Sequence, residues 1–143
     1  MPQLIKHIDQ IAREKQRDVL YLEFNPKPSE DDVWGDNNGR YYFEHDLVRK
    51  KILEDLTNMG VNWVSCGEFA SENCLMGYTG RIYIDVPFNK DLPLYQTLEA
   101  YLEHPDGTMH FETVRFYALS LHHAMKNAHH DEPGFWEKWA EKF

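Results

Sequence analysis

The residue types best suited to binding a metal gather near the end of the chain. Histidines stand at positions 122, 123, 129 and 130, and two acidic residues follow the last of them. Imidazole and carboxylate groups are the ligands that zinc, manganese and iron take in metal-dependent hydrolases. The stretch 44–46 could add further ligands from elsewhere in the chain. The candidate ligands within residues 122–132 are His129, His130, Asp131 and Glu132.

The spacing of these histidines does not favour one metal site on a single helix. His122 and His129 are separated by about 10 Å along a helix, and adjacent histidines point about 100° apart around its axis. No His-x-x-x-His pair occurs in the chain. Histidines at the end of a helix are also stabilised by the helix dipole. A metal-dependent hydrolase is therefore the alternative hypothesis.

Paired carboxylates are a second candidate for chemistry. Glu23 and Asp85 fall on two predicted strands that we expect to be neighbours, and adjacent carboxylates can serve in acid–base catalysis. Arg81 or Arg115 would instead neutralise them in an ordinary cross-strand network, which is the interpretation we favour. Asp46 is likewise explained by a helix N-cap.

Motifs of nucleophilic catalysis and of nucleotide binding are missing from the sequence. It has no G-x-S-x-G, no P-loop and no dinucleotide fingerprint. Cys66 and Cys74 have neither a zinc nor a redox spacing. We therefore expect no cofactor.

The composition limits the classes of partner. Among 143 residues, 15 are basic and 24 acidic, which gives a net charge of -9. This charge disfavours nucleic acid, and it favours a basic protein partner. We expect no membrane span, because no apolar run approaches the roughly 20 residues that one needs. With two cysteines and no leader sequence, we expect a cytoplasmic protein.

The hydrophobic pattern predicts one α+β domain over residues 1–143. Alternating residues indicate strands at 18–24, 61–65, 81–86 and 110–119, and helical periodicity indicates helices at 3–17, 46–59 and from Asp91 to Leu102. Asp91 is the predicted N-cap of the last of these helices. A helix capped by Ser120, with Leu121, Ala124, Met125 and Ala128 inward, and an aromatic helix at 133–143 follow. A long loop occupies 25–45. The order predicts a ferredoxin-like β-α-β-β-α-β core with a four-stranded antiparallel sheet, to which N-terminal and C-terminal helices are added.

This fold places both core helices on one face of the sheet and leaves the other face for binding. Tyrosine and arginine there are typical of binding hot spots. Alternatively, the first helix and the aromatic C-terminal segment fold across this face and bury it. The residues on it are Tyr21, Glu23, Arg81, Tyr83, Asp85, Arg115 and Tyr117.

The aromatic C-terminal segment is the last candidate surface. Phe135, Trp136, Trp139 and Phe143 would expose a large apolar patch if they did not pack on the domain. We expect packing on the domain; a homodimer through this segment is the alternative.

These observations favour a small acidic cytoplasmic protein that acts by binding. We expect a protein–protein interaction or inhibitor/immunity-type module without catalytic activity. The alternatives are a metal-dependent hydrolase using residues 122–132 and, with less support, a small-ligand pocket between the sheet and the long loop.

Overall fold

The computed structural model describes residues 5–24, 43–67, 69–70 and 80–141. They form a mixed α+β fold on one four-stranded antiparallel sheet, which confirms the predicted class. The strands are β1 (Val19–Phe24), β2 (Trp63–Ser65), β3 (Ile82–Ile84) and β4 (Val114–Leu119). The helices are α1 (Ile8–Lys15), α2 (Leu47–Asn58), α3 (Pro93–Leu102), α4 (Leu121–Ala124) and α5 (Phe135–Glu141), with short 3-10 helices η2 (Phe43–His45) and η3 (Met125–Asp131). Most of the predicted long loop, residues 25–42, lies outside the described residues.

The four strands pair in the order β2-β3-β1-β4. Leu20 in β1 lies opposite Ile84 in β3 on one side and Ala118 in β4 on the other. The predicted adjacency of the strand around Ile82–Ile84 to β1 is therefore confirmed. The predicted strand at 110–119 begins only at Val114, because the Val114 N–H donates to the Phe111 carbonyl in a turn.

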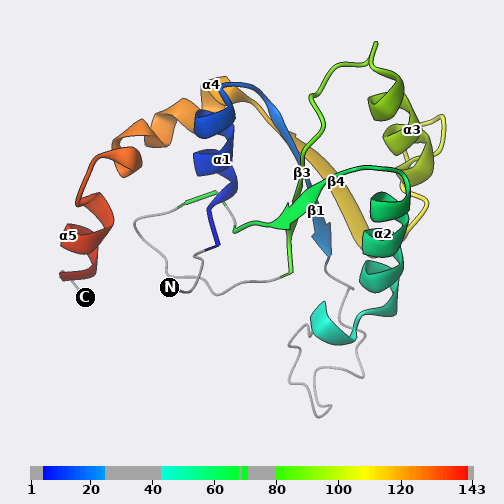
Figure 1. Cartoon of the computed structure of the whole chain (residues 1–143), viewed down its shortest axis with the longest axis horizontal. Coiled ribbons are helices and arrows are strands. Elements are labelled where there is room, and N and C mark those ends of the chain that lie inside the picture. The colour runs from blue at the N-terminus through cyan, green and yellow to red at the C-terminus, as the bar shows by residue number, and fades with distance from the viewer. Residues whose placement is uncertain (1–4, 25–42, 68, 71–79, 142–143) are drawn as a thin grey trace.

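The main core lies between the sheet and the pair α2 and α3, which cover the same face (Figure 1). Each fully buried Leu or Ile contributes about 1.5–3 kcal/mol to folding, so this layer supplies most of the stability. Its largest side chains are Leu20, Leu22, Phe24, Ile52, Leu56, Ile82, Ile84, Leu98 and Leu102.

Helix α1 packs on the opposite face of the sheet and covers only part of it. Ile8, Ile11 and Ala12 bury Tyr83 and Cys66 in a second, smaller cluster. The helix is shorter than the predicted 3–17. His7 forms a β-bridge with Gly67 just before it, and Gln16 ends it in a left-handed conformation with φ of 54°. The predicted coverage of this face by the first helix is therefore confirmed in part.

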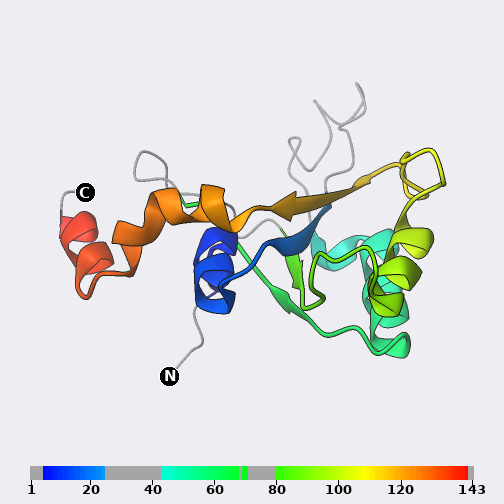
Figure 2. The ribbon, with the colours of Figure 1, turned by 90° about the horizontal axis from the view of Figure 1, so that it is seen from above.

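The C-terminal segment continues from β4 past α1 and away from the sheet (Figures 1 and 2). Ser120 is the predicted N-cap, since its hydroxyl oxygen accepts the His123 N–H. Ala124 is buried as expected, but Met125, predicted to point inward, is exposed. The expectation that the aromatic C-terminal segment covers the sheet is wrong, because α5 lies beyond α1.

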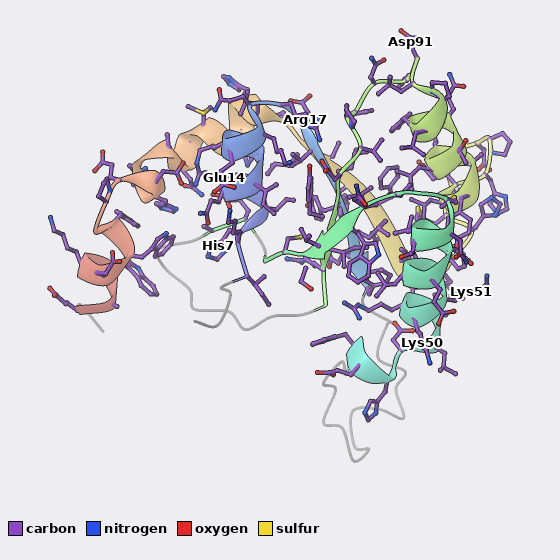
Figure 3. The ribbon with its side chains drawn as sticks, in the orientation of Figure 1. His7, Glu14, Arg17, Lys50, Lys51 and Asp91 are labelled. Atoms are coloured by element: carbon purple, nitrogen blue, oxygen red, sulfur yellow. The ribbon has the colours of Figure 1, made fainter. Side chains whose placement is uncertain are left out.

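The two predicted N-caps of the core helices have different outcomes. The Asp46 carboxylate accepts the N–H groups of Val48 and Arg49, so Asp46 caps α2 as predicted. Asp91 does not cap α3: Leu92 occupies that position, and Asp91 lies at the outer tip of the preceding turn (Figure 3). Within the described part of the chain, no helix has the length and apolar character needed to cross a bilayer.

Two glycines give a matched test of packing around η2. Gly80 and Gly107 have φ of 91° and 88°, but only at Gly80 would a Cβ meet a neighbour, 2.5 Å from Phe43 Cβ. We expect Gly107→Ala to cost about 1–2 kcal/mol through its backbone conformation, and Gly80→Ala to cost about 1–3 kcal/mol more through the clash. Urea unfolding measures both; equal losses would contradict the packing of Phe43 against Gly80.

Candidate functional site

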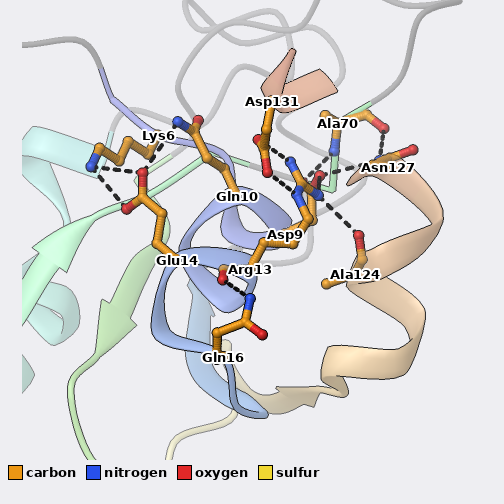
Figure 4. Close-up of polar contacts among 10 residues, drawn as sticks. All are labelled: Lys6, Asp9, Gln10, Arg13, Glu14, Gln16, Ala70, Ala124, Asn127 and Asp131. Carbon is orange, nitrogen blue, oxygen red and sulfur yellow. Dashed lines mark hydrogen bonds and ion pairs between the residues drawn. The ribbon is translucent and has the colours of Figure 1, made fainter. Parts of the chain in front are cut away.

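A buried arginine connects α1 to the C-terminal segment (Figure 4). The Arg13 side chain is 5% exposed, and its Nη1 donates to Asp9 Oδ2 at 2.7 Å and to the Ala124 carbonyl at 2.9 Å. Its Nε and Nη2 donate to the two oxygens of Asp131 at 2.7 and 2.9 Å. This bidentate contact fixes the orientation of the guanidinium plane relative to the carboxylate plane. The guanidinium therefore holds η3 against α1.

Asp9 completes this network and is fully buried. Its carboxylate also accepts the Ala70 N–H at 2.9 Å and the Asn127 side-chain amide at 3.2 Å. Burial opposes ionisation, but the hydrogen bonds from Arg13, Ala70 and Asn127 and the Arg13 charge outweigh it, so the pKa of Asp9 lies below its ordinary value. Three segments distant in sequence meet at this carboxylate.

The network changes the interpretation of the predicted metal ligands. Both oxygens of Asp131 are engaged by Arg13, so a metal there would have to displace the guanidinium. His130 is buried and stacks on Phe135 with ring centroids 4.6 Å apart, and its neighbour His129 meets the same ring edge-on. Glu132 is exposed on the turn before α5.

The second group of predicted ligands, at 44–46, lies in η2 and at the start of α2, on the far side of the sheet from η3 (Figure 1). Across residues 5–24, 43–67, 69–70 and 80–141, no three histidine, cysteine or acidic side chains are grouped so that they could hold a metal. The hydrolase alternative stays a prediction.

The predicted binding face divides into a covered half and an open half. Tyr83 belongs to the covered half: it is 3% exposed, and burial with a hydrogen bond to Asp85 raises its pKa to about 12. Asp85 accepts from the Tyr83 hydroxyl at 2.8 Å and from Arg17 at 2.7 Å. The Tyr83 bond, helped by the charges of Lys15 and Arg17, lowers the pKa of Asp85 in spite of its partial burial. These residues anchor α1, and Figure 3 shows Arg17 where α1 leads into β1.

The open half is centred on tyrosines that lie side by side on β1 and β4. Tyr21 and Tyr117 are directly opposite in the strand register, with ring centroids 5.4 Å apart, and Tyr117 is 41% exposed. Val64 lies at the other end of this row, on β2 beyond the covered Tyr83, and is 53% exposed. The row therefore presents an apolar and aromatic surface at the two edges of the sheet.

Charged residues flank this row on one side. Arg81 pairs with Glu23 at 3.2 Å, so both predicted residues lie together in a cross-strand network. Arg115 is exposed on β4, and its Nη1 donates to the carbonyl oxygens of Glu112 and Val114 at 2.7 and 3.0 Å. The structure thus brings five of the seven predicted residues together in the open half: Tyr21, Glu23, Arg81, Arg115 and Tyr117.

The expectation that Glu23 and Asp85 are neighbours is wrong. Antiparallel pairing sets Leu22 opposite Ile82 and Leu20 opposite Ile84. Glu23 therefore lies toward Arg81, while Asp85 lies toward the other end of β1. Each carboxylate has a cation beside it, and the two do not form an acid–base pair.

The Cys66 thiol is unsuited to nucleophilic catalysis. It is buried under α1, and burial raises its pKa to about 12, so the reactive thiolate is not formed near neutral pH. Cys74 lies outside the described residues.

Sequence reasoning missed Asp9 and Arg13, because charged residues in an amphipathic helix are expected on its exposed side. A usable signal was present: an acidic residue followed four positions later by a basic one forms an ion pair on a helix. The spacing predicts the pair but not its burial, which depends on η3. The exposed Val64 was also missed, although strand alternation places it on the same face as Tyr83.

Comparisons of the chain with protein-family models, with curated proteins and with solved structures return no match. The function therefore has to be inferred from the geometry of the site.

Removing Arg13 should destabilise the protein severely. Arg13→Ala leaves Asp9 buried without its cation, and loss of one partner of a buried ion pair costs about 3–5 kcal/mol. The matched control is Arg115→Ala, which removes an exposed guanidinium and should change stability by about 0.5 kcal/mol or less. Urea unfolding at neutral pH measures the stability of both variants. If Arg13→Ala loses no more stability than Arg115→Ala, the structural role of Arg13 is contradicted.

The Asp9 network also predicts an acid-dependent loss of stability. Because the pKa of Asp9 is lower in the folded state than in the unfolded state, its contribution is complete above the unfolded pKa of about 4 and is lost as pH falls through the folded pKa. Wild type should exceed Asp9→Asn in stability at pH 7, and the difference should shrink below about pH 4. Urea unfolding between pH 7 and acid measures it; a difference independent of pH would show that Asp9 is not ionised in the fold.

Proposed function

We propose that this protein acts by binding a protein partner through the open half of its sheet, as an interaction or inhibitor/immunity-type module without chemistry of its own. One observation carries the proposal. Helix α1 covers the Tyr83 side of the face and leaves Tyr117 and Arg115 exposed together on β4. Aromatic and apolar side chains left exposed together on a rigid element are typical of interaction sites.

The composition of the open half suits protein recognition. Tyrosine and arginine dominate binding hot spots, because they combine large contact area with directed hydrogen bonds. Tyr117 packs beside Tyr21, and both stand on paired strands rather than on a loop. Such a surface loses little conformational entropy when a partner binds.

The strand order supports a finer description of the fold. The order β2-β3-β1-β4, with α2 and α3 on one face, is that expected of the ferredoxin-like arrangement. In that arrangement the second face of the sheet is available, and this is where the proposed surface lies. We also place the protein in the cytoplasm, a proposal supported by the free thiol of Cys66.

Substitutions at the open half should abolish partner capture and leave the fold intact. We expect Tyr117→Ala and Arg115→Ala to weaken retention of the partner by about tenfold or more, as hot-spot truncations do. The measurement is quantitative capture from an extract of the source cells, with unfolding of each variant measured in parallel.

Lys51→Ala is the matched control, because Lys51 is exposed on α2, on the other side of the sheet (Figure 3). It should retain the partner fully. Unchanged capture by Tyr117→Ala and Arg115→Ala would place the function elsewhere, and severe destabilisation by Tyr117→Ala would show that Tyr117 is part of the core.

A further inference from the structure

The edge of the sheet next to the proposed surface indicates what the partner presents. Resting on the function proposed above, we propose that an extended, acidic segment of the partner protein pairs with β4 as an added strand. The proposal depends on three features of β4: the direction of its backbone groups, the side chains beside them, and the charge of Arg115.

The backbone of β4 has hydrogen-bonding groups that point out of the sheet. β4 is the last strand in the order, and no further strand of the described residues pairs with it. The Val114 N–H bonds to the Phe111 carbonyl at 3.1 Å rather than to β1, so it faces away from the ladder. Because bonding direction alternates along an antiparallel strand, Phe116 and Ala118 also direct their N–H and C=O groups outward. These groups are available to an added strand.

The side chains of β4 would contact such a strand on the open face. Arg115 and Tyr117 alternate with Phe116, so they lie next to each other on that face. Side chains of a strand added beside β4 would lie opposite them at the ordinary cross-strand spacing. Tyr117 offers an exposed ring for an apolar or aromatic residue, and Arg115 offers a guanidinium one position along the same face.

The charge of Arg115 selects an acidic segment. Arg81 and Arg17 have carboxylates beside them, at Glu23 and Asp85. Within the described residues, Arg115 forms no ion pair: its hydrogen bonds go to backbone carbonyls, and Glu23, which lies opposite it in the register, is paired with Arg81. An aspartate or glutamate opposite it would form a charge-assisted hydrogen bond, whereas a lysine there would be repelled.

The local charge and the total charge of the protein predict opposite partners. The net charge of -9 favours a basic partner. However, charges on the surface are screened beyond about 8 Å at physiological salt, so a residue bound at β4 interacts mainly with the side chains next to it. Arg115 is the one charged residue of β4, and Glu23, which lies opposite it in the register, is paired with Arg81. A segment docked on β4 therefore meets the positive charge of Arg115 at the contact.

Selection from a library of random peptides tests the inference directly, with peptides of about six residues to match the length of a strand. The full chain is the target. We expect the selected peptides to be rich in aspartate and glutamate, and Arg115→Glu to shift the selection toward lysine and arginine. Ala118→Pro removes one outward N–H, which an edge strand tolerates, and should weaken binding by about tenfold or more. Ala118→Val keeps this N–H and should bind as wild type does.

Basic peptides selected by the wild-type chain would overturn the charge preference, and equal binding to Ala118→Pro would overturn strand addition. Failure to select any peptide would overturn both. A wild-type dimer that Ala118→Pro dissociates would also overturn both, because β4 would then pair with a second copy of the chain. In each case, partner capture that is still lost in Tyr117→Ala leaves the proposed function standing. If Tyr117→Ala captures the partner as well as wild type does, the proposed function is contradicted too.

Discussion

The position of the C-terminal segment depends on the Arg13 guanidinium, and the accessible surface of the sheet depends on that position. Arg13 binds Asp9 within its own helix and Asp131 at the end of η3. These bonds direct the chain after β4 to the far side of α1. Helix α1 spans only about 12 Å, so by itself it cannot cover the whole face of the sheet. The open half around Tyr117 is the consequence.

A buried ion pair of this kind contributes more to selecting one arrangement than to net stability. Removing Arg13 and Asp9 from water costs several kcal/mol per ion, and their attraction with the added hydrogen bonds mainly offsets that cost. Other positions of η3 would break the bonds from Arg13 to Asp131 and the bond from Asn127 to Asp9. The network therefore favours one placement of residues 121–141, in the way that buried polar groups specify register in other folds.

Charge has two separate effects in this protein. The excess of carboxylates is spread over the chain, whereas the edge strand β4 carries one charged residue, Arg115. Long-range attraction and solubility follow the total, while the side chains at a contact respond to their neighbours within a Debye length. An acidic protein can consequently present a positive edge, and the partner that it attracts from a distance need not be basic where it docks.

The strands, the main helices and the antiparallel α+β class could be predicted from the sequence, because period-two and helical patterns are local properties of the chain. It also placed Tyr21, Glu23, Arg81, Arg115 and Tyr117 on one face, since alternation fixes the side to which each residue of a strand points. The folded chain was needed to show that Tyr83 and Asp85 are covered, that Glu23 lies far from Asp85, and that Asp9 and Arg13 are buried. Each of these depends on register or on a contact between segments more than 50 residues apart. A local pattern specifies the face of an element, but the partner of that face is set by packing.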